Sequence, residues 1–300
     1  MRCCNKNPVI VLQSGQKLCK SHFCKYFEKK LMRTIRRFRL LGKKEHLGIA
    51  LSGGKDSSSL LFALKKIFKN NKGIKISAIL IDEGINGYRN KTKRRAEKLC
   101  KKLDVPLHVY SFRKEFGHSL DGILQKLKSN PCTECGILRR YLINKAARSL
   151  KVTKLATGHN LDDEAQAILM NQFRKNTALQ ARLGPITGIS SSDMFVPRVK
   201  PFYLLSEKEV ALYAYLNGLY SEYETCPYEH DSFRAVVRDK LNEIENTSQG
   251  TKNNIVASFL EIHPLLQRKY KGKGIPICSN CGEPSSGNIC NACKLIGRIN

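Results

Sequence analysis

Long apolar runs and acidic side chains are both scarce in this 300-residue sequence. No stretch approaches the roughly 18 consecutive apolar residues that a membrane-spanning helix needs, so a membrane-embedded protein is not expected. The first residues, Met1 to Lys6, are polar and rich in cysteine, and they contain no apolar core of a signal peptide. The expected compartment is therefore the cytoplasm, without a membrane partner.

The shortage of acidic residues leaves a large positive charge. Lys and Arg number 53 against 25 Asp and Glu, which gives a formal net charge of +28. An excess of this size is typical of a protein that binds a polyanion, so nucleic acid is the expected partner. Charge alone separates neither RNA from DNA nor a binding protein from an enzyme, and plain solubility is the alternative interpretation.

Secreted disulfide scaffolds are short and dense in cysteine, and this long chain does not fit that class. Most of its 12 cysteines gather in CxxC-like groups, which favours metal binding. The predicted organisation has three parts. A Cys/His module covers residues 1–25, an α/β domain with a helical extension covers 26–270, and a second Cys module covers 271–300.

The middle of the chain alternates short apolar runs with amphipathic segments. The predicted strands cover residues 47–51, 76–81, 107–112 and 154–157, and the predicted helices cover 57–68, 91–103, 136–150 and 162–174. This alternation predicts an α/β fold with a doubly wound parallel sheet, which binds ligands where the strand order reverses. Beyond residue 178 the pattern is helical, with a capping box at Ser206 and Glu209 and further helices over 230–245 and 254–267.

A glycine-rich turn joins the first predicted strand to the first predicted helix, with the sequence Ser52-Gly53-Gly54-Lys55-Asp56-Ser57. Glycines let backbone N–H groups approach a phosphate, and a helix N-terminus adds free donors and a positive dipole end. Lys55 adds a positive charge, and Asp56 could hold Mg²⁺ on a pyrophosphate. The turn is not a Walker A loop, yet it favours nucleotide binding over a purely structural turn.

Three cysteines lie in the middle of the chain. Cys132 and Cys135 form a CxxC, and Cys226 stands alone. Three thiolates are one short of the four ligands of structural zinc, and they suit a cluster or metal with one open position. The alternatives are a redox dithiol at Cys132 and Cys135, a zinc completed by His118 or His230, and an inert core position for Cys226.

The two ends of the chain carry further cysteines. At the C-terminal end two CxxC pairs, eight residues apart, predict a four-cysteine zinc site formed by Cys278, Cys281, Cys290 and Cys293. At the N-terminal end Cys19 and His22 form a half-site for a second zinc. Its remaining ligands are expected from Cys3 and Cys4, with Cys24 as a substitute because adjacent cysteines rarely share one zinc. Cys100 is predicted to be a core residue of a helix.

Four segments, in order along the chain, resemble those of one protein family. Residues 52–57 resemble the SGGxDS PP-loop of ATP pyrophosphatases, and residues 82–89 resemble a DEGIxGYR segment. Residues 131–136 are similar to PCxxCG, and residues 156–165 to ATGHNLDDEA. Together with Cys226 these are the marks of the TtcA/TtuA and NcsA group of tRNA 2-thiouridine synthetases, and the resemblance extends over nearly the whole chain.

This resemblance implies a sulfurtransferase that uses ATP and Mg²⁺ on tRNA, with Asp56 and Asp163 as catalytic residues. The nucleotide-binding positions that it implies are Ala50, Ser52, Gly53, Gly54, Lys55, Asp56, Ser57, Arg139, Gly158 and Asp163. It also implies a 4Fe–4S cluster on Cys132, Cys135 and Cys226, with one iron free for sulfur. A persulfide relay through the same cysteines is the alternative.

In the reaction implied by the family, the C2 oxygen of a uridine is adenylated and then replaced by sulfur. The sulfur comes from a ubiquitin-fold carrier protein or from sulfide. The family has branches for uridine 34, uridine 54 and cytidine 32, and terminal zinc modules argue against the last. A homodimer is one assembly compatible with these features.

Several basic residues are candidates for tRNA phosphate contacts: Arg139, Arg140, Arg234 and Arg238. Some family members have Lys at the position of Arg139, and Arg can clamp a phosphate but cannot act as a base. His159 is either a site residue or a core histidine. The competing functions are a lysidine-type or amidotransferase-type PP-loop enzyme and a non-enzymatic zinc-finger RNA-binding protein.

Overall fold

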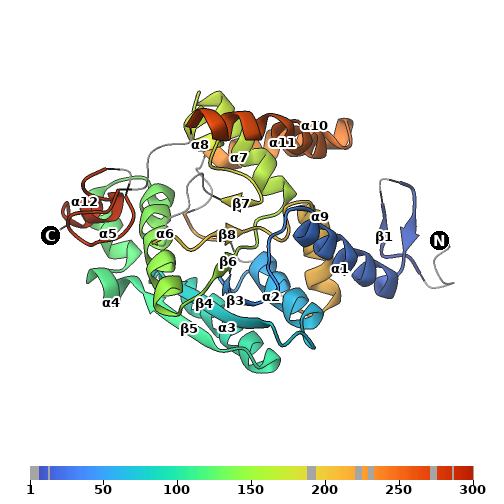
Figure 1. Cartoon of the computed structure of the whole chain (residues 1–300), viewed down its shortest axis with the longest axis horizontal. Coiled ribbons are helices and arrows are strands. Elements are labelled where there is room, and N and C mark those ends of the chain that lie inside the picture. The colour runs from blue at the N-terminus through green and yellow to red at the C-terminus, as the bar shows by residue number, and fades with distance from the viewer. Residues whose placement is uncertain are drawn as a thin grey trace.

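The computed structural model describes residues 7–12, 14–187, 194–219, 225–228, 233–270, 276–285 and 287–299. A six-stranded sheet lies at its centre, in the order β5-β4-β3-β6-β8-β7 (Figure 1). The strands are β3 (Glu45–Ala50), β4 (Ile74–Asp82), β5 (Leu107–Ser111), β6 (Lys154–Ala156), β7 (Ile186–Thr187) and β8 (Arg198–Val199). All neighbours pair in parallel except β7, which runs antiparallel to β8. The predicted α/β class is confirmed.

The two central strands are apolar on both faces because helices cover both. In β4 the four consecutive residues Ala78 to Ile81 are all buried, which is the pattern of a parallel strand inside a sandwich of helices. One face packs against α1 (Lys20–Arg37), α2 (Lys55–Ile67), α3 (Arg89–Leu103) and α9 (Glu207–Leu216). The other packs against α4 (Phe112–Phe116), α5 (Leu120–Leu127) and α6 (Pro131–Ser149).

The strand order reverses beside the first strand of the sheet. From β3 the chain adds β4 and β5 on one side and then crosses to place β6 on the other side. The loop after β3 leads into α2, and the loop after β6 leads into α7 (Leu161–Phe173). Two helix N-termini therefore open on the same crevice, which is where such sheets bind ligands.

A helical part stands over the carboxyl end of β6. It contains α7, α8 (Thr177–Gln180), α10 (Phe233–Thr247) and α11 (Thr251–Tyr270), which lie together at the top of Figure 1. Their apolar core includes Val237, Leu241, Val256 and Phe259. The predicted capping box is present, because Ser206 Oγ accepts from Glu209 N at 3.2 Å and the Glu209 carboxylate accepts from Ser206 N at 2.7 Å.

The two terminal modules lie on opposite sides of the sheet (Figure 1). A hairpin of β1 (Ile10–Val11) and β2 (Lys17–Leu18) precedes α1, and α12 (Asn291–Ile296) packs with the last cysteines against α6. The helix α1 was not predicted, and it runs through residue 25, the predicted end of the N-terminal module. None of the described helices is long and apolar enough to cross a membrane.

Two predicted boundaries differ in ways that affect the site. The helix expected from residue 136 begins at Pro131, because the Asn130 side chain caps it by accepting from Thr133 N at 3.1 Å. Cys132 and Cys135 therefore lie in the first two turns of α6. Phe112, predicted as the end of a strand, instead begins α4, which the Ser111 side chain caps.

Candidate functional site

Two glycines let the loops after β3 and β6 approach each other closely. A Cβ atom on Gly158 would lie 3.0 Å from the carbonyl carbon of Asp56 and 3.1 Å from the backbone nitrogen of Ser57. Gly53 has a φ of +84°, and a Cβ there would collide with the carbonyl oxygen of Thr92. The structure thus brings the predicted nucleotide-binding residues of both loops together at the strand-order reversal.

A buried arginine contacts the backbone of the glycine-rich loop. Arg89 donates to the carbonyl oxygen of Ser52 at 2.9 Å and forms an ion pair with Glu83 at 2.6 Å. Both side chains are buried, and Glu83 also faces Arg139, with 3.7 Å between charged atoms. Neither Glu83 nor Arg89 has a role predicted from the sequence, although both belong to the segment 82–89 that resembles DEGIxGYR.

Two carboxylates contact the lysine of the loop. Lys55 Nζ lies 3.1 Å from Asp56 Oδ2 and 2.9 Å from Glu207 Oε1. Burial raises the pKa of Asp56; Lys55 opposes this shift, whereas the charges of Asp163 and Glu207 add to it. Asp56 Oδ1 is buried and finds no hydrogen-bond donor among the described residues. A free buried oxygen in this acidic cluster fits a divalent cation that accompanies a pyrophosphate.

Asp163 caps its own helix and also contacts a cation of the helical part. Its Oδ2 accepts from Asn160 N at 3.1 Å and completes a capping box at the start of α7. Its Oδ1 faces Arg234 of α10 at 3.3 Å. The carboxylate is therefore fixed at the crevice by its own helix, and it is paired with a cation from the helical part.

His159 lies among positive charges rather than in the core. Its Nδ1 is 2.9 Å from Thr157 Oγ1, and part of the ring reaches solvent. Desolvation by the surrounding protein and the charges of Lys200 and Arg234 lower the pKa of His159. These two cations are themselves paired with carboxylates, Lys200 with Glu164 at 2.7 Å and Arg234 with Asp163 at 3.3 Å.

The three central cysteines come together from segments far apart in the sequence. Cys135 and Cys226 pack in the same cluster beside α6. Cys132 Sγ donates to the carbonyl oxygen of Tyr228 at 3.3 Å. Burial raises the pKa of Cys135 to about 11; Arg139 opposes this, while Glu83, Cys226 and Cys132 add to it. Cys226 is thus not an isolated core residue, and the three thiols lie beside the Glu83–Arg139 pair.

The distances between sulfur atoms distinguish the C-terminal cysteines from the central cysteines. Within the described ranges, only the terminal cysteines form a group of three or more metal-ligating side chains with all ligand atoms within 4.8 Å. Cys132, Cys135 and Cys226 do not form such a compact group among the described residues. His118 does not join them in such a group, and His230 lies outside the described residues.

The C-terminal cysteines form the predicted four-ligand group: Cys278, Cys281, Cys290 and Cys293. The sulfurs of Cys281 and Cys290 are 3.7 Å apart, close to the ~3.8 Å that a tetrahedral zinc with ~2.3 Å bonds imposes. Backbone N–H groups donate to Cys278 Sγ at 3.2 Å and to Cys290 Sγ at 3.3 Å. Such donors favour thiolates, so the residues fit a structural zinc.

We expect Cys290→Ser to remove about one zinc per chain and to lower the melting temperature, because structural zinc supplies folding energy to small modules. Metal analysis and a thermal melt on the same preparation check this. Iron should not change, since the four terminal sulfurs form a ligand group that includes none of the central cysteines. An unaltered zinc content would contradict the site.

The two residues of the predicted N-terminal half-site lie next to each other. Cys19 Sγ lies 3.2 Å from His22 Nδ1 at the start of α1. The Cys24 sulfur accepts from Asn217 Nδ2 of α9 at 3.8 Å and is not grouped with that pair. Cys3 and Cys4 lie outside the described residues, so this zinc site stays a prediction.

Comparison with known proteins decides the family. A PP-loop domain model matches residues 24–245. The chain is 40% identical to the tRNA-5-methyluridine(54) 2-sulfurtransferase of Pyrococcus horikoshii, over 93% of this chain and 87% of that protein. This chain belongs to the PP-loop tRNA 2-thiolation family.

Two further PP-loop relatives agree. The tRNA 2-thiolation protein NcsA of Haloferax volcanii is 36% identical, over 99% of this chain and 98% of that protein. A solved structure, the U34-tRNA thiolase NcsA from Methanococcus maripaludis with its 4Fe–4S cluster, superimposes with a TM-score of 0.82. It is 32% identical and covers 97% of this chain and 93% of that chain. The resemblance and the PP-loop fold expected from the sequence are confirmed.

Proposed function

We propose that this chain is an ATP-dependent tRNA sulfurtransferase that converts a uridine into 2-thiouridine. The observation that carries the proposal is that one polar network joins the phosphate loop to the central cysteines. Arg89 contacts both the carbonyl of Ser52 and the carboxylate of Glu83. Glu83 pairs with Arg139, whose charge acts on Cys135. Activation by ATP and sulfur delivery would thus take place in one crevice.

ATP would be held between the loops after β3 and β6. Backbone N–H groups of residues 52–57, the Lys55 charge and the N-terminus of α2 suit its phosphates. Asp56 and Asp163 are the carboxylates available for Mg²⁺. The C2 oxygen of the uridine attacks the α-phosphate and pyrophosphate leaves. Hydrosulfide then replaces AMP at C2, so the products are 2-thiouridine, AMP and pyrophosphate.

Cys132, Cys135 and Cys226 would hold a 4Fe–4S cluster. When bound, a cluster on three thiolates has one iron without a protein ligand, and sulfide can be held there. The chain itself orients the first thiol through the carbonyl of Tyr228 and buries the second beside Arg139. The positive charge of Arg139 offsets part of the negative charge of the ligands.

The tRNA would approach over the basic side of the crevice. Arg139, Lys200 and Arg234 surround His159 there, and Arg140 lies next to Arg139. Arg234 and Arg238 both belong to α10, so their phosphate contacts would bring the helical part against the RNA. Sulfide or a thiocarboxylated ubiquitin-fold carrier would donate the sulfur. Zinc would stabilise both terminal modules. The reaction would take place in the cytoplasm.

We expect protein purified without oxygen to be brown and to form 2-thiouridine in unmodified tRNA only when ATP and sulfide are both supplied. Iron, labile sulfide and zinc would be measured, and nucleosides from digested tRNA would be analysed by mass spectrometry, including positions 34 and 54. Formation of AMP tests adenylation. A colourless, zinc-only protein that binds tRNA without thiolating it would contradict the proposal and favour an RNA-binding role.

A further inference from the structure

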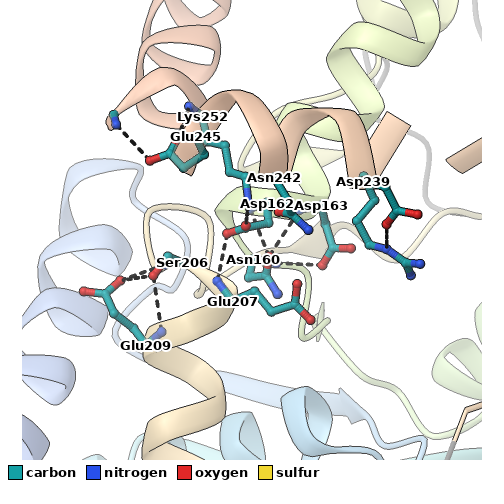
Figure 2. Close-up of polar contacts among 12 residues, drawn as sticks. Asn160, Asp162, Asp163, Ser206, Glu207, Glu209, Asp239, Asn242, Glu245 and Lys252 are labelled. Carbon is teal, nitrogen blue, oxygen red and sulfur yellow. Dashed lines mark hydrogen bonds and ion pairs between the residues drawn. The ribbon is translucent and has the colours of Figure 1, made fainter. Parts of the chain in front are cut away.

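A buried carboxylate joins three helices behind the phosphate loop. Asp162, in the first turn of α7, forms an ion pair through Oδ1 with Lys252 Nζ of α11. Its Oδ2 accepts from the backbone N–H of Glu207, the first residue of α9, at 2.8 Å. Figure 2 shows Asp162 between these two donors. Both oxygens are used, so the Asp162 side chain fixes α9 relative to α11.

The turn between α10 and α11 orients the Lys252 side chain. The carboxylate of Glu245 accepts from the backbone N–H groups of Gly250 and Lys252, each at 2.8 Å. Lys252 Nζ also donates to Asn242 Oδ1 at 2.6 Å (Figure 2). The Lys252 side chain is buried and points inward from a turn that its own helix pair holds rigid.

The same contacts continue to the phosphate loop. Glu207, whose backbone is held by Asp162, pairs through its carboxylate with Lys55 at 2.9 Å. Lys55 in turn contacts Asp56 at 3.1 Å. A line of direct contacts therefore runs from α11 through α7 and α9 to the lysine that faces the crevice. Buried ion pairs contribute little net stability, so stability alone is a weak reason for this arrangement.

We propose that the Lys252–Asp162 ion pair positions Lys55 for ATP through Glu207, which makes the α10–α11 helices part of the ATP site. Lys252 and Asp162 touch no substrate; they are positioning residues. Without the pair, Asp162 is no longer fixed to α11, the first turn of α9 that it holds shifts with it, and Glu207 no longer holds Lys55 in place over the loop. This inference rests on the proposed use of ATP, and it adds a dependence of ATP recognition on how the helical part is docked.

The test separates positioning from stability. Lys252→Met leaves the Asp162 charge buried and unpaired, so the melting temperature should fall. In the double variant Asp162→Asn with Lys252→Met no charge remains, and the melting temperature should recover. The KM for ATP should nevertheless stay raised by about tenfold in both variants, which corresponds to ~1.4 kcal/mol of lost phosphate interaction. The affinity for tRNA and the iron content should match wild type.

A matched control is an ion pair on other elements. Arg148 of α6 pairs with the buried Glu283 at 2.5 Å, and neither residue belongs to α7, α9 or α11. Arg148→Met should lower the melting temperature without changing the KM for ATP. If the wild-type enzyme is active and the double variant has the same KM for ATP as wild type, the positioning role is overturned. Inactive wild-type enzyme would instead contradict the proposed function.

Discussion

Cys226→Ala is expected to abolish tRNA thiolation and to lose most of its cluster iron while ATP still binds. In a cluster held by three thiolates, each thiolate is the only protein ligand of one iron, so removal of any one exposes the cluster to loss. Cys226 reaches Cys132 and Cys135 only through the fold. Iron, labile sulfide, 2-thiouridine and ATP binding would be measured on one anaerobic preparation.

The control for this variant is Cys100→Ala. Cys100 is buried in α3 among apolar residues, as predicted from the sequence, so the variant should lose only packing and keep its iron and activity. A redox dithiol makes a different forecast, in which Cys132 and Cys135 matter and Cys226 does not. Full iron and full activity in the Cys226 variant would refute the cluster at these residues. Anaerobic activity of iron-free wild type fed a persulfide donor, whose outer sulfur is transferred to a cysteine thiol without net oxidation, would support the persulfide relay.

Asp56→Asn is expected to lower ATP-dependent thiolation by a hundredfold or more, on the order of the several kcal/mol that metal–phosphoryl contacts provide. The same change should raise the melting temperature of the ligand-free protein. Burial raises the pKa of Asp56 despite Lys55, with Asp163 and Glu207 adding to the effect, so its charge is unfavourable in the folded state. Asn removes that charge and keeps the shape of the side chain.

The pH dependence gives the sign of this effect. Because the folded-state pKa is above the unfolded one, the native protein holds more protons between the two values, and stability falls as pH rises through that window. The gain in melting temperature from Asp56→Asn should therefore be complete near neutral pH and vanish as pH falls into the ordinary carboxyl range. The exposed Asp104, which ends α3, provides the control Asp104→Asn. A large loss of activity without any rise in melting temperature would contradict the conclusion that the Asp56 charge destabilises the ligand-free protein.

Local sequence was sufficient for features that depend on neighbouring residues. The turn at residues 52–57, the capping box at Ser206 and the four terminal cysteines all follow from chemistry within a few positions of one another. The alternation of apolar and amphipathic segments also predicted the parallel sheet, because that periodicity reflects which faces are covered. The errors fell where a cap decided the boundary, as when Asn130 started α6 five residues early and placed the CxxC on a helix.

The sequence by itself therefore determined the class of fold, the phosphate loop and the four-cysteine group at the C-terminal end. Only the tertiary structure decided which distant residues complete the crevice. Glu207 reaches Lys55 across 152 positions, and Lys252 reaches Asp162 across 90. No periodicity encodes such pairs, because they depend on how α9 and α11 dock after the sheet has formed. The sequence shows which of these residues are charged, but the packing of the helices determines which of them pair.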